Sequence, residues 1–261
     1  MRQVESDDES QDTFDRIVGD GEDRLQRRLL TLLGTGLLGG IDVGTGVLAY
    51  LVVDAKTHDT LLAGIAFSIG FVALLLGRGE LFTENFMVPV TAVVARKGTV
   101  LSLLRLWGVT LVLNLIGGWL VTWLLIRARP DLKATAVEVA TPYAKLGVNL
   151  HSFALAVLAG LVITLMTRMQ QADDSLGVKL VPAVLFGSLL AAGQLFHSVL
   201  DSLLMFCALH AGAPFGYLDW LSAMGWSALG NVVGGVAFVT FVRLLRVPHR
   251  VAEARAVNSP E

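Results

Sequence analysis

Six apolar stretches run through this chain, and two of them are interrupted by polar and charged residues. They cover residues 29–53, 61–95, 102–126, 148–169, 180–211 and 222–246. A membrane hydrocarbon core is about 30 Å thick, and a helix needs about 20 residues to cross it. Because 54% of the residues are hydrophobic and only 16% are charged, the composition predicts an all-α membrane protein with several spans.

The second and fifth stretches have lengths that fit neither one crossing nor two. As continuous helices, 61–95 and 180–211 would measure about 52 Å and about 48 Å. Two half-helices that meet at a non-helical segment inside the membrane fit both lengths. Such a segment is tolerated only where protein or a water-filled cavity lines it. We therefore expect six transmembrane helices, of which the second and fifth are broken.

The two ends of the chain differ from the apolar part between them. Residues 1–23 carry nine acidic residues and no apolar segment of a secretory signal, which favours a disordered acidic tail. This tail and an amphipathic lead-in make up residues 1–28. Residues 29–246 form the expected transmembrane channel domain, and residues 247–261 a polar C-terminal tail.

Lysines and arginines are unevenly distributed between the two ends of the expected spans. With both termini cytoplasmic, twelve lie at the inner ends and five at the outer ends. Such an excess on the cytoplasmic side is typical of membrane proteins, and most tyrosines and tryptophans fall near the outer ends, where their rings anchor in the bilayer interface. We therefore expect a multi-pass protein with cytoplasmic N and C termini.

Several functional classes are disfavoured by the sequence. The net charge of −2 gives no reason to expect nucleic-acid binding. Cys207, the single cysteine, excludes an intrachain disulfide framework and a cysteine-rich metal site. No G-x-S-x-G or H-E-x-x-H motif occurs, and His197 and Ser198 would point about 100° apart on a helix. We expect no enzyme activity, no metal and no cofactor.

Two pairs of short motifs recur in the same order in both halves of the chain. "GELF" at 79–82 matches "GQLF" at 193–196, and "NLIGG" at 114–118 matches "NVVGG" at 231–235. Each half contains three spans, so the second half enters the membrane from the opposite side. This pattern predicts two inverted three-helix repeats with a substrate path where the broken helices meet. The second pair of motifs also suits close helix packing and interhelical hydrogen bonds, through Asn114, Gly118, Asn231 and Gly235.

Polar residues gather at membrane depth in the two interrupted stretches. They are Arg78, Glu80, Thr83, Glu84 and Asn85 in the first half, and Gln194, His197, Ser198 and Asp201 in the second. A charge at the centre of a membrane helix costs about 2.5–3.5 kcal/mol, so such groups pair or face a cavity. Arg78 and Glu80 are expected to neutralise one another across a turn, either to pin the helix break or to line the path.

His197 is the strongest candidate for a functional side chain. It directly follows the second break, so we expect it to point toward the midplane space between the two half-helices. An imidazole exchanges a proton near neutral pH more readily than any other side chain. Asp201, one helical turn later, either orients His197 or lies at the end of the path.

The motifs resemble those of the formate/nitrite transporter family. The resemblance rests on "GELFTEN" followed by a proline-containing half-helix, "NLIGG", "LFHS" and "GNVVGG", and covers about residues 29–246. It implies an aquaporin-like fold with six spans and a pore in each protomer. It also implies a homopentamer in a bacterial-type inner (plasma) membrane that passes small monovalent anions such as formate, nitrite, hydrosulfide or lactate.

The resemblance also assigns roles to individual residues. Leu81, Phe82 and Thr83 match the family's loop in the broken second span, with Phe82 and Phe196 at corresponding breaks. His197 takes the place of the pore histidine that shares a proton with the anion, and Thr83 bonds that histidine or the substrate.

The chain departs from the family pattern at several positions. Arg78 and Glu84 stand where small residues, often glycine, are usual. Phe196 replaces a glutamate, Asp201 an asparagine, and Thr164 an asparagine in span four. Lys145 is the nearest counterpart of a vestibule lysine that the family carries ahead of that span.

The sequence therefore predicts a channel or a proton-coupled transporter for a small monovalent anion. Two alternatives stay open. In one, Arg78 pairs with Glu80 or Glu84 and plugs the pore, which leaves a structural or regulatory membrane protein. In the other, the acidic residues line a path for a cation or ammonium.

Overall fold

The computed structural model describes residues 2–258, and their side chains from residue 13 onward. This part of the chain is helical throughout and contains no strand. Its elements are α1 Arg2–Leu25, α2 Leu29–Thr57, α3 Thr60–Phe67, α4 Ile69–Gly77, the 3₁₀ turn η1 Phe82–Phe86, α5 Val88–Val94, α6 Val100–Ala128, η2 Pro130–Leu132, α7 Lys133–Leu146, α8 Leu150–Gln170, α9 Leu176–Ala192, α10 Leu200–Ala211, α11 Tyr217–Val232, the π-helical segment η3 Val233–Phe241, α12 Val242–Leu244 and α13 Pro248–Val257.

Five helices in the described part of the chain are long and apolar enough to cross a membrane. They are Leu29–Thr57, Thr60–Gly77, Val100–Ala128, Leu150–Gln170 and Tyr217–Leu244. The shorter apolar helices α9 and α10 occupy the place of the fifth apolar stretch. Helix is interrupted at both expected positions, between α4 and α5 and between α9 and α10.

Both interruptions begin with the same kind of helix end. The backbone turns left-handed at Arg78 (φ 53°) and at Gln194 (φ 48°). The next amide N–H then bonds back to a carbonyl in the preceding turn, Gly79 to Leu74 at 3.0 Å and Leu195 to Leu190 at 3.3 Å. This six-residue hydrogen bond is the usual way to satisfy carbonyls at a helix C-terminus. Neither left-handed residue is a glycine, although glycine adopts this conformation at least cost.

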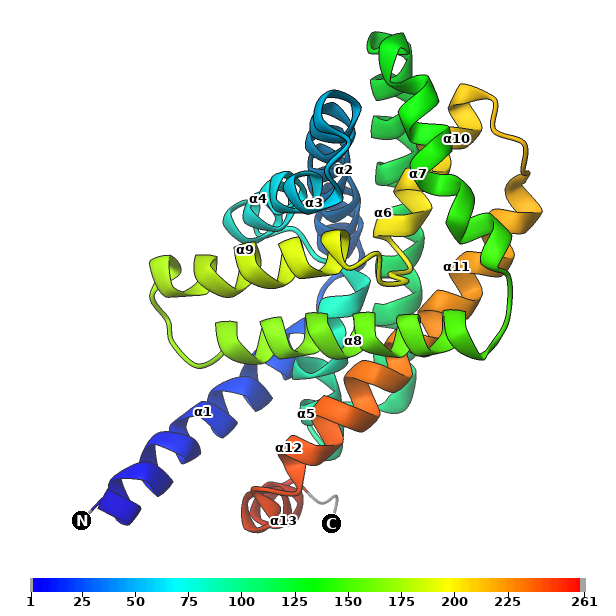
Figure 1. Ribbon diagram of the computed structural model, residues 1–261. Coiled ribbons are helices and arrows are strands. Elements are labelled where there is room, and N and C mark those ends of the chain that lie inside the picture. Colours follow the sequence, from blue (N-terminus) through cyan, green and yellow to red (C-terminus); the bar gives the residue numbers. More distant parts are fainter. Residues whose placement is uncertain (1, 259–261) are drawn as a thin grey trace.

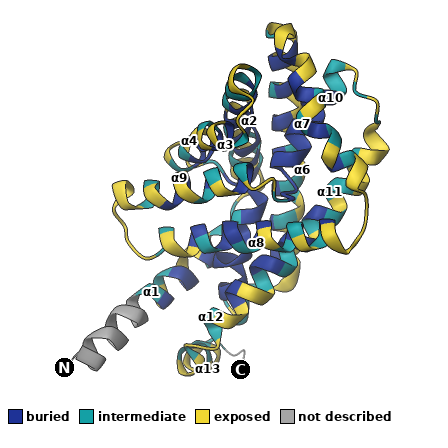
Figure 2. Ribbon diagram, viewed as in Figure 1, coloured by how far each residue is buried: buried dark blue, intermediate teal, exposed yellow. Residues whose placement is uncertain are grey.

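The helices pack closely around the two interruptions. α2 lies along α6, α8 lies along α11, and α10 packs against α6 and α7. Figure 1 shows α8 and α9 crossing the vertical group formed by α2, α6 and α7. Buried residues concentrate where α2, α6, α8 and α10 meet, and exposed residues cover the outer faces of α9 and α11 (Figure 2).

Glycines permit two close helix crossings. A side chain at Gly117 would meet the carbonyl of Leu37 in α2, and one at Gly234 would meet the carbonyl of Val157 in α8. A side chain at Gly118 would likewise meet Leu203, and one at Gly235 would meet Thr164. The Asn-x-x-Gly-Gly motifs therefore serve as helix-packing motifs, as their composition predicts.

The N-terminal region is more ordered than the sequence suggests. Instead of a disordered acidic tail, residues 2–25 form α1, which lies along α5. The helix is amphipathic in its second half, where Phe14, Ile17, Val18 and Leu25 are buried. An apolar face that covers α5 supplies the free energy that a solvated acidic segment lacks.

Two further elements lie outside the six expected spans. α7 follows the third long helix and packs on α10, with Ala136, Ala140 and Tyr143 buried. α13 follows the last span, and Arg255 and Asn258 bond to the carbonyls of Val94 and Ala95 at the end of α5. Both ends of the described chain consequently lie at the same end of the molecule (Figure 1).

Candidate functional site

The two helix interruptions meet at a hydrogen bond between Thr83 and His197. Thr83 Oγ1 lies 2.8 Å from His197 Nε2, and both side chains are fully buried. Leu81, Phe82 and Phe196 are buried beside them. The contact is one of the two that the resemblance assigns to Thr83, with His197 or with the substrate. Its role in transport stays a prediction.

A second hydrogen bond fixes the protonation pattern of the His197 ring. The backbone N–H of Leu200 donates to Nδ1 at 3.0 Å. Nδ1 therefore acts as an acceptor and carries no proton, so the neutral ring has its proton on Nε2. Nε2 donates that proton to Thr83 Oγ1, which leaves the hydroxyl proton of Thr83 available for another acceptor.

Asn114 and Asn231 hold the two interruptions with matching sets of hydrogen bonds. Asn114 Nδ2 donates to the carbonyls of Gly36 and Glu80, both at 2.8 Å, and Oδ1 accepts the N–H of Phe82 at 2.9 Å. Asn231 bonds in the same way to residues 156, 196 and 198, at 2.8, 2.8 and 2.9 Å. One buried amide in each half thus satisfies backbone groups that no helix pairs.

These bonds correct the expected register between the two halves. They match Glu80 with Phe196 and Phe82 with Ser198, which is two residues beyond the pairing of "GELF" with "GQLF". Gly79 follows the left-handed residue of its break, whereas Gly193 precedes it. The two motifs therefore share letters without sharing a position. His197 occupies the place that Leu81 has in the first half, and Phe82 and Phe196 are not equivalent.

Aromatic rings surround both interruptions. Phe82 makes edge contacts with Phe86 and Trp107 at ring-centroid distances of 5.0 and 6.3 Å. Phe196 packs on Tyr143 of α7 at 5.1 Å. The polar pair Thr83–His197 is thus enclosed by apolar groups on both sides, an environment in which hydrogen bonds are strong because no water competes for them.

Asp201 binds the backbone of the second break and not the histidine ring. Its Oδ2 accepts the N–H of His197 at 2.8 Å. Asp201 Oδ1 and Ser198 Oγ are buried and have no hydrogen-bond partner among the described residues. The sequence left open whether Asp201 orients His197, and the structure shows that it positions the His197 backbone.

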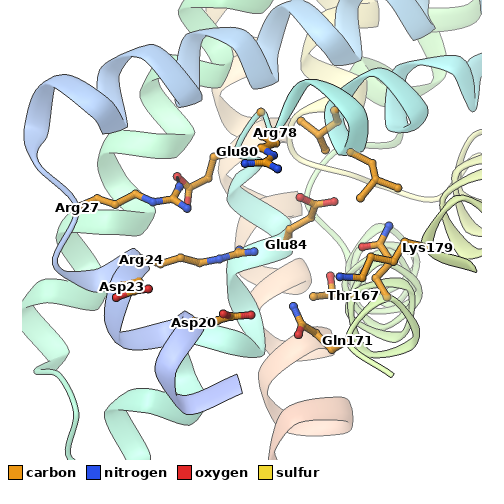
Figure 3. Close-up of a pocket in the computed structure, with 14 residues that line it drawn as sticks. Asp20, Asp23, Arg24, Arg27, Arg78, Glu80, Glu84, Thr167, Gln171 and Lys179 are labelled. Carbon is orange, nitrogen blue, oxygen red and sulfur yellow. Dashed lines mark hydrogen bonds and ion pairs between the residues drawn. The ribbon is translucent and has the colours of Figure 1, made fainter. Parts of the chain in front are cut away.

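A charged cavity of about 450 Å³ adjoins the first break (Figure 3). Its lining combines four cations and four carboxylates with uncharged residues within and just after α4 and α8, namely Arg24, Arg27, Arg78, Lys179, Asp20, Asp23, Glu80, Glu84, Leu74, Leu75, Gly79, Thr167, Gln170 and Gln171. We call this cavity the charged mouth. Residues of α1 face residues of α8 and α9 across it (Figure 3).

The ion pairing in the charged mouth differs from the expectation. Glu80 pairs with Arg27, whose Nη1 lies 2.5 Å from Oε2, and also accepts from Thr35 at 3.2 Å. The described residues contain no ion pair between Arg78 and a carboxylate. The predicted Arg78–Glu80 ion pair is therefore wrong. The segment between α1 and α2 brings Arg27 to the Glu80 carboxylate instead, and Glu80 is only 3% exposed. An Arg78–Glu84 pair is likewise absent from this part of the structure.

The remaining predicted residues take less central positions. Asn85 is buried and accepts from Arg24 Nη1 at 2.9 Å, while Glu84 lines the charged mouth. The buried Thr164 hydroxyl has no partner among residues 13–258 and lies against Gly235. Lys145 is exposed at the end of α7, away from the buried pair.

Sequence reasoning missed three residues that shape the site. Arg24 and Arg27 bind the first break from the N-terminal region. In the sequence, their basic cluster indicates only the orientation of the chain in the membrane. Tyr143 packs on Phe196, and the polar segment around it gives no sign of a buried helix. The helical spacing of positions 136, 140 and 143 is the local signal for α7.

Comparison with known proteins gives a consistent result. A sequence model described as "Formate/nitrite transporter" matches residues 11–245. The chain is 27% identical over 240 residues to the inner membrane protein YfdC of Escherichia coli strain K12, over 87% of this chain and 74% of that protein. It is also 27% identical over 113 residues to the formate channel BtFdhC of Bacillus thuringiensis, over 41% of this chain and 44% of that protein.

Solved structures share the fold. One described as a pentameric formate channel with formate bound superposes with a TM-score of 0.72 at 22% identity, over 84% of this chain and 97% of the other. Another, described as an FNT family ion channel, gives a TM-score of 0.77 at 19% identity, over 90% and 98%. At these identities the likeness establishes the fold.

Proposed function

Because the chain belongs to the formate/nitrite transporter family, we propose that it is an inner-membrane channel or transporter for a small monovalent anion. The proposal is supported by the relative named as an inner membrane protein and by the formate channels among the relatives and the fold neighbours. It agrees with five long apolar helices in the described chain.

The Thr83–His197 hydrogen bond carries the proposal. It places a single polar pair where two helix interruptions meet, with Leu81, Phe82 and Phe196 around it. Since His197 donates to Thr83 Oγ1, the threonine hydroxyl donates its own proton to a passing anion. A small monoanion gains this hydrogen bond in place of a water molecule, whereas a cation cannot use the hydroxyl proton.

The finer architecture is part of the same proposal. We infer six crossings in two inverted three-helix repeats, since Asn114 and Asn231 make equivalent bonds and since helix breaks occur once in each half. Cytoplasmic termini are supported by the distribution of basic residues. A homopentamer is supported by the pentameric neighbour and by the exposed leucines on the outer helix faces.

Proton coupling through His197 stays a prediction with a structural condition attached. To become charged, the ring must take a proton on Nδ1, which now accepts the Leu200 N–H at 3.0 Å. That hydrogen bond must therefore break in each cycle in which His197 takes up a second proton. Without such a break, His197 acts as a fixed donor that orients Thr83.

Anion flux into proteoliposomes tests the proposal. Thr83→Val keeps the side-chain shape and removes the hydroxyl, so formate and nitrite uptake is expected to fall at least about tenfold, as the loss of about 1.4 kcal/mol at the barrier implies. Thr122→Val is the matched control, because Thr122 is also fully buried but bonds only carbonyls of its own helix. Uptake no greater than in protein-free vesicles, or a reversal potential that follows the cation gradient, would refute the anion proposal.

A further inference from the structure

A second polar cluster lies next to Phe196, apart from the Thr83–His197 pair. Tyr143, Ser198, Asp201, Ser202 and Ser227 line it, with Phe196, Met205, Ala223 and Met224 completing its wall. The residues come from α7, the second break, α10 and α11. We call this space the Asp201 cavity.

Two buried oxygens in this cluster have no partner among the described residues. Asp201 is 5% exposed and uses Oδ2 for the His197 N–H, which leaves Oδ1 unpaired. Ser198 is fully buried, and its Oγ is also unpaired. Ser202 is no donor to either, because its hydroxyl donates to the Ser198 carbonyl at 2.6 Å. The cluster therefore presents a carboxyl oxygen and a hydroxyl with unused hydrogen-bonding capacity.

The surroundings of Asp201 disfavour a negative charge there. No lysine or arginine lines the Asp201 cavity, and the space between the side chains is too narrow for a water molecule. The titratable groups that face Asp201 are Tyr143 from α7 and His197 from the break, while α11 contributes Ser227 and apolar groups. His197 is neutral while Leu200 bonds its Nδ1. An ionised Oδ1 would consequently have neither solvent nor a counter-charge.

We propose that Asp201 is a neutral carboxylic acid in the resting protein, and that its Oδ1–H and the Ser198 hydroxyl form a two-donor binding site for the transported anion. This inference rests on the proposed function, because it places a second binding site for the same transported anion beside Phe196. A carboxylate substrate accepts both donors through its two oxygens. The proton stays on Asp201, and the site is lost when Asp201 ionises and repels the anion.

Entry of the anion requires the cavity to widen. Met205 and Met224 border it, and unbranched thioether side chains rearrange at low cost. The Phe196 ring forms part of the cavity wall and packs on the Tyr143 ring, with the two ring centroids 5.1 Å apart. Rotation of Phe196 would connect the Asp201 cavity with the position of Thr83 and His197.

Asp201→Asn tests this site, because the amide keeps the shape and an N–H donor but cannot ionise. The measured quantity is the initial rate of formate uptake into proteoliposomes at each pH. The rate of Asp201→Asn is divided by the rate of wild type, so that the titration of formate itself cancels. The ratio is expected to rise about tenfold for each pH unit above the point where Asp201 loses its proton. Asp42→Asn is the matched control, since Asp42 also has an unpaired buried oxygen but does not line the cavity. Its ratio is expected to stay constant.

Infrared difference spectroscopy gives a readout that does not depend on flux. Wild type minus Asp201→Asn is expected to show the carbonyl band of a neutral carboxylic acid, and added formate is expected to shift this band. An Asp201→Asn ratio that stays constant with pH, or the absence of the band or of its shift, overturns the inference. Failure of the proposed function looks different, because wild type then carries neither formate nor nitrite.

Discussion

Replacing Asn114 with leucine is expected to destabilise the protein strongly, because this one amide bonds three backbone groups. Asn114 is fully buried, and leucine has nearly its shape but no polar atom. The substitution removes bonds to the carbonyls of Gly36 and Glu80 and to the N–H of Phe82. The last two groups have no other hydrogen-bond partner in the described chain.

The magnitude follows from these lost partners. A buried backbone group without a partner costs about 1–3 kcal/mol, whereas hydrogen bonds measured between membrane helices average about 0.6 kcal/mol. Three lost bonds and two unpaired groups therefore predict a loss of about 2–4 kcal/mol. For a chain of this size, that lowers the melting temperature by about 5–15 °C.

Cys207 provides the assay. It is the only cysteine of the chain, it is fully buried in α10, and it has no disulfide. A thiol-specific fluorophore therefore labels the detergent-solubilised protein only when the core opens, and labelling during heating reports unfolding. Thr110→Val is the matched control in the same helix, because the Thr110 hydroxyl is buried and makes no hydrogen bond within residues 13–258.

Asn231→Leu extends the test to the second half. Its three bonds match those of Asn114 in kind and length, so the two variants are expected to lose similar stability. If Asn114→Leu melts within about 2 °C of Thr110→Val, the inference that these amides hold the breaks is refuted.

Three further substitutions test other parts of the structure. Arg27→Gln leaves Glu80 buried without its ion-pair partner, so α1 is expected to become sensitive to protease and stability to fall by about 1–3 kcal/mol, while Glu80→Gln on the same background restores part of the loss. Arg78→Gly relieves a left-handed residue with φ 53° and is expected to raise stability by at most about 1 kcal/mol in the same thermal assay, because glycine also gains entropy when unfolded. Gly117→Ala places a methyl group against the Leu37 carbonyl and is expected to cost about 1–3 kcal/mol. A melting temperature equal to that of wild type would contradict the first and the last of these.

The sequence predicts the two breaks because membrane thickness limits helix length, whereas the contact of Thr83 with His197 or the substrate is predicted by the family resemblance alone. A stretch such as 61–95 has few ways to place its residues across a bilayer, so polar residues within it mark the interruption. The same limit applies to 180–211. Resemblance to a family then indicates which of these polar residues face one another.

The sequence does not predict the register of the halves or the ion pair of Glu80. The register depends on which residue adopts the left-handed backbone conformation. Arg78 and Gln194 adopt it, and neither is the glycine that usually indicates this conformation in a sequence. The Arg27–Glu80 pair joins residues 53 positions apart, so only the fold of α1 and α2 brings them together. The order of α1 likewise depends on the surface of α5, which no local pattern reveals.

The matched hydrogen bonds of Asn114 and Asn231 have a consequence for the direction of anion flux through the proposed pore. They hold both breaks through the same set of backbone hydrogen bonds, yet Leu81 occupies in one break the position that His197 occupies in the other. The shared hydrogen bonds therefore give no reason to expect rectification in the proposed pore, and any difference between inward and outward current is expected to come from side chains that differ between the halves, such as Leu81 and His197, or from the charged mouth beside the first break.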